Sequence, residues 1–70
     1  MTSPVQNPIE LLTERELEVL RFVALGKLDD EIAQRCDVSA VSVQNHLHNI
    51  FKKIKVSNRL QAILWAGFYL

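Results

Sequence analysis

Cysteine, glycine and proline are all scarce in this chain of 70 residues, which has one cysteine, two glycines and two prolines. The single cysteine, Cys36, cannot form an internal disulfide, so we expect a reduced, cytoplasmic setting. No Cys/His cluster has the spacing of metal ligands, and no cofactor or metal is expected. There is no glycine-rich phosphate loop and no nucleophile–base set beyond two histidines on one predicted helix, so we do not expect an enzyme.

Long hydrophobic runs are also missing. No apolar run approaches the roughly 18 residues that a membrane-spanning helix needs, and no signal-peptide pattern opens the chain, so no membrane association is expected. The apolar fraction of 49% is instead that of one small globular domain. A core of this size is marginal, so few apolar residues can be spared for other work.

Net charge is zero, which is unusual for a nucleic-acid binder. The charges are unevenly distributed, however. Residues 29–48 carry one basic and four acidic groups, whereas residues 49–70 carry four basic groups and no acidic group. Any contact with phosphates is therefore expected in the C-terminal third, which holds Lys52, Lys53, Lys55 and Arg59.

The first two predicted helices follow a segment, residues 1–9, that contains both prolines and is interpreted as a tail or linker. Thr13 and Glu16 form a capping box that starts the first helix, and Gly26 ends it. The side chains expected on its buried side are Leu17, Leu20, Val23 and Ala24. The second helix, residues 29–36, begins with three acidic residues, where the helix dipole favours negative charge, and buries Ile32, Ala33 and Cys36.

The third predicted helix begins at the cap residue Ser39 and carries an apolar stripe with steps of four, three and four residues: Val43, Leu47, Ile50 and Ile54. At about 100° per residue, its opposite face holds Val41, Gln44, Asn45, His48 and Lys52. His46 lies between the two faces and is expected to pack beside the first helix.

A fourth helix is predicted from the cap residue Ser57 to about Tyr69, and it is apolar on more than one side. The surplus indicates a partner surface, most simply a second copy of the same helix. We expect a homodimer interface made of Leu60, Leu64, Trp65 and Phe68. For Trp65, packing within its own domain is the alternative.

Four helices and no strand pattern predict an all-α domain over residues 10–70, with a helix-turn-helix at about 29–48. Several sequence blocks then resemble the LuxR/GerE-type helix-turn-helix domain: LTEREXEVL at 12–20 (with Leu17 at X), EIA at 31–33, S-x-x-S-V at 39–43, H-x-x-NIF-x-K at 46–53 and V-S-N-R at 56–59. The resemblance covers about residues 11–66. It implies the DNA-binding part of a bacterial transcription regulator, in which the third helix enters the major groove and the fourth helix forms the dimer.

Carried over by position, the resemblance implies contacts with double-stranded DNA from Ser39, Val41, Ser42, Gln44, Asn45, His48, Lys52 and Lys53. The two serines stand near phosphates, Asn45 and His48 at variable base-reading positions, and the two lysines at the phosphate-facing end. Gln44 and Asn45 have the donor and acceptor that an adenine edge requires. For His48, base contact and simple exposure to solvent both remain open. A receiver or sensor domain in a longer parent chain is a further implied partner.

Three departures from the family pattern reduce positive charge or helix capping. Leu28 replaces a capping serine, so Asp29 is expected to cap; Asp30 stands where lysine or glutamine is common; and Gln44 stands where lysine is most frequent. The alternative function is therefore a protein-interaction module that modulates a DNA-binding partner without binding DNA tightly itself. Glu16 and Arg59 lie in two of the matching blocks, and an ion pair between them is expected.

Overall fold

The computed structural model describes residues 8–70, and the predicted tail lies mostly outside them. Five helical elements follow one another: the 3-10 helix η1 (Pro8–Leu11), then α1 (Glu14–Ala24), α2 (Asp29–Cys36), α3 (Ala40–Ile54) and α4 (Arg59–Tyr69). No strand occurs among the described residues, so the predicted all-α fold is confirmed. The short η1 turn was not predicted, and its first two residues belong to the segment interpreted as a tail.

Helix α1 begins and ends as the sequence predicts. The Thr13 hydroxyl accepts a hydrogen bond from the Glu16 amide, at 3.1 Å, and the Glu16 carboxylate accepts one from the Thr13 amide, at 2.9 Å. At the other end Gly26 has φ +82°, the left-handed conformation that glycine adopts most easily. The Gly26 amide donates to the Val23 carbonyl and the next amide donates to the Phe22 carbonyl, so the last carbonyls of the helix are satisfied.

The buried face of α1 differs in part from the prediction. Leu20 and Val23 are fully buried as expected, but Val19 is buried too, and Ala24 is exposed. Ala24 lines an open groove between α1 and α4. The inward face is therefore centred one residue earlier than the sequence pattern indicated.

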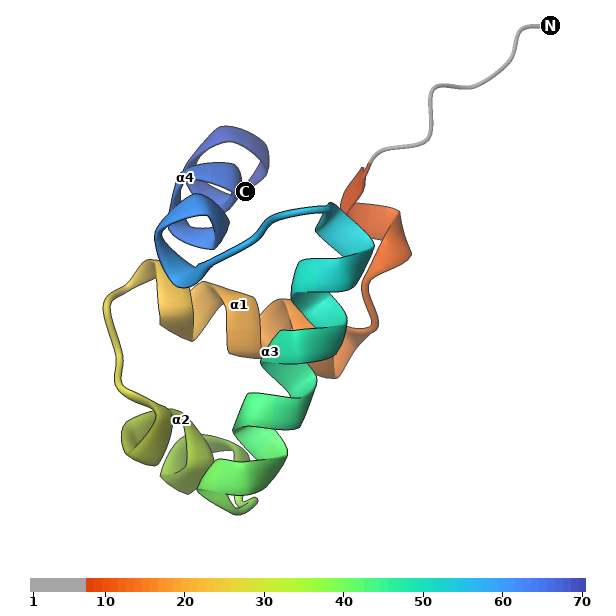
Figure 1. Cartoon of the computed structure of the whole chain (residues 1–70). Helices are drawn as coiled ribbons and strands as arrows, with labels where there is room; N and C mark the ends of the chain where they lie inside the picture. The colour runs from red at the N-terminus through yellow and green to blue at the C-terminus, as the bar shows by residue number, and fades with distance from the viewer. Residues whose placement is uncertain (1–7) are drawn as a thin grey trace, which may run out of the picture.

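Helix α1 lies at the centre of the domain and contacts each of the other three α-helices (Figure 1). Helices α2 and α3 pack together on one side, and α4 packs on α1 at the other. The predicted stripe of α3 is buried throughout, and it joins Ile32, Ala33 and Cys36 of α2 in one core. Between α2 and α3 only residues 37–39 intervene, and Asp37 adopts a left-handed conformation with φ 57° that reverses the chain.

Two predicted helix caps are wrong. Leu28, not Asp29, is the N-cap of α2, and its amide donates to the Glu31 carboxylate at 2.9 Å. Asn58, not Ser57, caps α4, and its side-chain oxygen accepts from the Gln61 amide at 2.9 Å. In both cases the N-cap residue lies one position from the expected one.

Candidate nucleic-acid interface

The first turn of α3 is capped by Ser39. The Ser39 backbone is extended, and its hydroxyl oxygen accepts a hydrogen bond from the Ser42 amide at 3.1 Å. The Ser39 hydroxyl also donates to the Ser42 hydroxyl oxygen at 3.1 Å, which leaves the Ser42 proton free to point outward. The first amides of a helix have no intrahelical acceptor and lie at the positive end of its dipole, so this turn suits an anion.

The face of α3 opposite the core is exposed along its length. Val41 is 66% exposed, and Gln44, Asn45, His48 and Lys52 are exposed as well. Within residues 8–70, the side chains of Gln44, Asn45 and His48 make no hydrogen bond. Their donors and acceptors are therefore available to another molecule. Because the opposite stripe is buried in the core, the helix that carries them has a fixed orientation.

The lysines at the end of α3 differ in their surroundings. The Lys53 ammonium lies 2.7 Å from Glu16 Oε1, across 37 residues of sequence. Lys52 is exposed and forms no ion pair within the described part of the chain. Lys53, which the family resemblance placed with Lys52 at the phosphate-facing end, thus has an intramolecular partner.

Glu16 is the buried acidic group of the domain, with 6% of its surface exposed. Burial by itself raises the pKa of the Glu16 carboxyl, but Lys53 and the hydrogen bonds from Thr13 outweigh burial, so the pKa lies below its ordinary value. The expected pair between Glu16 and Arg59 does not form. Arg59 instead lies 2.7 Å from Asp29 and donates to the Lys27 carbonyl at 2.7 Å, because the α4 N-terminus faces the start of α2 rather than that of α1.

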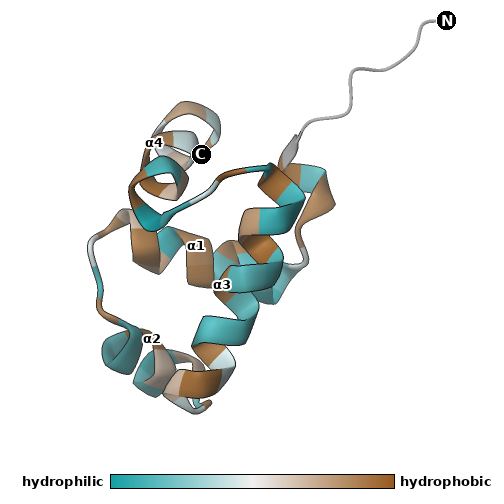
Figure 2. Ribbon diagram, in the orientation of Figure 1, coloured by the Kyte–Doolittle hydropathy of each residue, from teal (hydrophilic) through white to brown (hydrophobic). Residues whose placement is uncertain are grey.

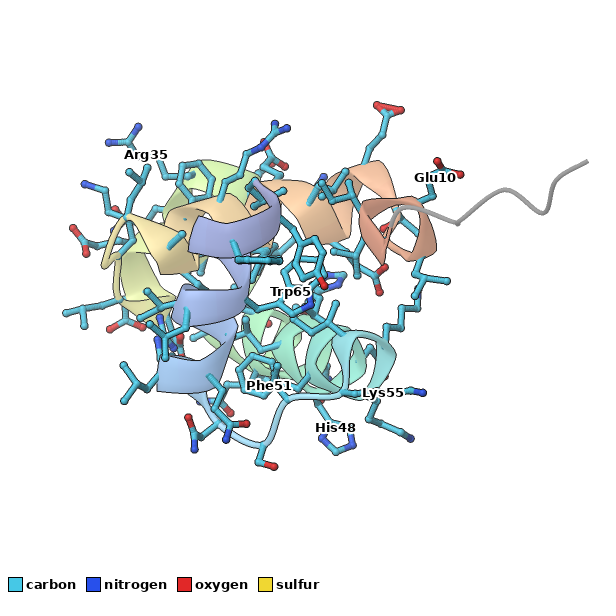
Figure 3. All side chains as sticks on the ribbon, turned by 90° about the horizontal axis from the view of Figure 1, so that it is seen from above. Glu10, Arg35, His48, Phe51, Lys55 and Trp65 are labelled. Atoms are coloured by element: carbon cyan, nitrogen blue, oxygen red, sulfur yellow. The ribbon has the colours of Figure 1, made fainter. Side chains whose placement is uncertain are left out.

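Most acidic side chains in and directly after α2 are exposed to solvent. Asp30 and Glu31 are exposed in its first turn, and Asp37 is exposed at its end. The one basic residue of this segment, Arg35, lies on the opposite side of the molecule from His48 (Figure 3). The charge deficit seen in the sequence is therefore present on the surface.

Helix α4 exposes three large apolar side chains at steps of four residues: Leu60 (66% exposed), Leu64 (65%) and Phe68 (80%). Beyond its first turn the helix is largely hydrophobic (Figure 2). Trp65 differs, because it is half-buried against the core and its ring centroid lies 4.6 Å from that of Tyr69. Packing within its own domain, the alternative that the sequence left open, therefore accounts for much of the Trp65 surface.

A shallow apolar groove of about 480 Å³ runs beside this surface, between α4 and the end of α1. Its apolar lining includes Leu25, Ile63, Gly67 and Leu70. Leu25, 71% exposed, was not among the predicted interface residues. Its position directly before the helix-ending Gly26 gives no periodic signal that could have found it.

The described residues contain no group of His, Cys, Asp and Glu side chains that could hold a metal ion. Cys36 is buried in the core as predicted, and its thiol lies 3.8 Å from a Glu18 carboxylate oxygen. None of the helices formed by residues 8–70 has the length and hydropathy to cross a membrane.

A short helix, a tight turn and a longer helix with an exposed polar face together define a helix-turn-helix protein. Residues 10–66 match the family described as bacterial regulatory proteins, luxR family. The chain belongs to this family, and the resemblance found in the sequence is confirmed.

Curated relatives carry regulatory names. The chain is 48% identical to the CsgBAC operon transcriptional regulatory protein of Escherichia coli (strain K12) over 57 residues. The matched segment is 81% of this chain and 26% of that relative. A probable csgAB operon transcriptional regulatory protein of Salmonella typhimurium matches equally well. The response regulator protein VraR of Staphylococcus aureus is 40% identical over 57 residues, 81% of this chain and 27% of VraR. The chain thus spans about a quarter of the length of these relatives.

Proposed function

We propose that this chain is a sequence-specific DNA-binding domain that reads the major groove with α3 and forms a homodimer through α4. The observation that carries the proposal is the exposed face of α3. Within residues 8–70 the side chains of Gln44 and Asn45 have no partner on this face, while the opposite face of the same helix is buried in the core. A helix fixed in this way can hold free polar groups at defined positions, as contact with base edges requires.

The chemistry of this face suits base edges. The amides of Gln44 and Asn45 each offer a donor and an acceptor, which match N7 and N6 of adenine in a bidentate contact. Val41 can contact a thymine methyl group. His48 in its neutral form donates one hydrogen bond and accepts one.

Phosphate contacts are assigned to the two ends of α3. At the start, Ser39 and Ser42 and the free amides of the first turn suit a phosphate oxygen. At the end, Lys52 is exposed and unpaired within residues 8–70. Few cations take part, so few counterions are released, and non-specific affinity should be low with a shallow salt dependence.

Pairing through α4 compensates for weak binding by one domain. Leu60, Leu64 and Phe68 form a stripe that its own domain does not cover. Two copies joined by such a stripe would present two α3 helices to successive half-sites, which is the usual arrangement of dimeric helix-turn-helix proteins. Linking the two contacts raises the overall affinity without any new contact to DNA.

The names of the relatives suggest the setting. The Escherichia coli relative is named as a regulator of transcription of one operon, and VraR is named a response regulator. We extend to this chain a role in controlling transcription, with a receiver or sensor domain as a partner in the intact regulator.

The second candidate is a protein-interaction module that works through α4 and binds DNA poorly. The exposed acids of α2 favour it, as does the use of Lys53 by Glu16. Exposed Gln44 and Asn45, whose side chains have no partner within residues 8–70, favour DNA binding.

A salt titration separates the two candidates. Binding of the 70-residue chain to a labelled random duplex is followed by fluorescence anisotropy from about 25 mM to 300 mM salt, with self-association measured by sedimentation in the same buffers. DNA binding predicts measurable affinity at low salt that declines as salt rises. No binding at any salt, with self-association intact, would favour the interaction module.

A further inference from the structure

The C-terminal end of α3 has a feature that the proposed DNA contacts do not use. Lys55 follows the last residue of the helix and adopts φ 60° and ψ 46°, a left-handed conformation that glycine adopts at the least cost. Its chain reversal is closed by the Val56 amide, which donates to the Phe51 carbonyl at 3.0 Å. A charged residue therefore stands where the backbone favours the absence of a side chain.

The Lys55 side chain is not needed inside the domain. It is exposed, and within residues 8–70 it forms no ion pair. It lies on the same side of the molecule as His48 of the exposed α3 face, whereas Arg35 lies on the opposite side (Figure 3). The ammonium group of Lys55 thus extends the surface that Gln44, Asn45 and His48 begin.

With the first half of α3 at the bases, as proposed, helix length would bring Lys55 to the DNA backbone. Lys55 is eleven residues after Gln44, which corresponds to about 16 Å along a helix axis. The major groove is roughly 12 Å wide, so a helix whose first half contacts bases reaches the sugar-phosphate rim before its end. The end of a helix also carries partial negative charge, which phosphates repel unless cations lie nearby.

Resting on the proposed DNA-binding function, we propose that Lys55 is a phosphate-binding residue that acts with Lys52 at the rim of the groove, and that Lys53 is a positioning residue. Lys53 holds α3 against α1 through its 2.7 Å contact with Glu16. The three lysines at the end of α3 thus divide into two that face DNA and one that fixes the angle of the helix.

Lys55→Asn tests the first half of the proposal, because asparagine tolerates the left-handed conformation and carries no charge. The control is Arg35→Gln, which removes one exposed cation from the opposite side, and Lys55→Arg restores charge. Affinity of each 70-residue protein for one random duplex is measured at 50 mM and 200 mM salt, with helix content checked by circular dichroism.

Raising the salt concentration from about 50 mM to 200 mM should weaken DNA binding by the parent. For Lys55→Asn the factor by which affinity falls should be about three- to fourfold smaller, since one phosphate contact accounts for about 0.9 units in the slope of log affinity against log salt. Arg35→Gln and Lys55→Arg should keep the parental slope. A parental slope in Lys55→Asn would overturn the role of Lys55 while leaving DNA binding in place. If the parent bound no duplex at all, both this inference and the proposed function would fall.

Lys53→Met tests the second half. This substitution should lower the unfolding midpoint and reduce the dependence of stability on pH in the range where Glu16 titrates. The dependence of DNA affinity on salt should stay close to that of the parent. Lys53→Arg should restore stability. A slope reduced by one unit with unchanged stability would instead show that Lys53 contacts phosphate and would overturn its positioning role.

Discussion

Helices α3 and α4 each turn one face to solvent, but the two exposed faces are opposite in character. The outer face of α3 carries amide, imidazole and ammonium groups, whereas that of α4 carries Leu60, Leu64 and Phe68. Their inner faces differ as well. Helix α3 buries four large aliphatic side chains, while the fully buried positions of α4 are only Ala62 and Ala66.

This difference indicates two kinds of partner. A helix held by large buried side chains keeps a defined orientation, which suits polar groups that must meet fixed hydrogen-bonding positions. A helix held by small side chains and exposing a hydrophobic stripe gains more from association with another apolar surface. The comparison therefore supports the proposal that α3 contacts bases and that α4 forms the dimer.

The largest expected effect comes from the inner face of α3. Ile50→Ala removes a fully buried side chain and should lower the free energy of unfolding by about 2–5 kcal/mol, measured by urea denaturation. Asn49→Ala, at the exposed neighbouring position, is the control and should change stability little. Equal effects of the two substitutions would mean that α3 is not anchored as the structure describes.

The outer face of α3 should matter for binding and not for stability. Gln44→Ala and Asn45→Ala should each cost about 1–3 kcal/mol on the preferred duplex and relax sequence preference, because base contacts are lost. Lys52→Ala should weaken all duplexes about equally. Competition titrations with matched and scrambled duplexes measure both effects, and the same response from all three variants would place the reading face elsewhere.

The ion pair between Glu16 of α1 and Lys53 of α3 should make the stability of the domain depend on pH. Since the pKa of Glu16 is lowered in the folded protein, its contribution is present above about pH 4.5 and is lost as pH falls through the folded-state pKa. Glu16→Gln should reduce the free energy of unfolding by about 1–2 kcal/mol at pH 7, because a charged hydrogen bond becomes neutral. Urea denaturation at pH 7 and pH 3 should show the difference from the parent shrinking; a constant difference would argue against the ionised pair.

Removing apolar groups from α4 should weaken self-association without unfolding the domain. Leu64→Ala and Phe68→Ala should each cost about 1 kcal/mol or more of association energy, because apolar area no longer leaves water. Trp65→Ala should weaken association too, but it should also lower stability, since Trp65 packs on the core. Sedimentation at rising concentration measures the effect, and a parent that stays monomeric at millimolar concentration would remove the proposed dimer.

The smallest effect is expected from the acidic start of α2. Asp30→Lys should tighten binding to specific and random duplex alike by a few tenths to about 1 kcal/mol, because a carboxylate near a phosphate is replaced by a cation. The gain in affinity should largely vanish above roughly 0.3 M salt, because the Debye length is then shorter than the distance between the Asp30 position and the phosphate. Preference that depends on Gln44 should stay unchanged; a shift in preferred sequence would mean that Asp30 contacts bases.

Periodicity and capping patterns were sufficient to predict the fold. The α3 stripe, the Thr13–Glu16 capping box and the glycine after α1 follow from local rules, and each is found in the structure. Side chains that act across the chain were less predictable. The partners of Glu16 and Arg59 lie 37 and 30 residues away, and their choice depends on how helices cross, which no local pattern specifies.

The candidate site shows the same division. Exposure of Gln44, Asn45, His48 and Lys52 was predicted correctly, because it follows from the helical period. The different roles proposed for Lys53 and Lys55 could not be separated in the sequence. One is set by a tertiary ion pair and the other by a left-handed backbone at the helix end.

The most direct test of base reading by α3 is a selection of bound sequences from a random duplex pool, carried out with the parent and with Gln44→Ala and Asn45→Ala. We predict that the parent enriches a defined site made of two related half-sites, and that each substitution broadens the preference at particular positions of that site. No enrichment by the parent, or an identical enriched site from all three proteins, would contradict the account.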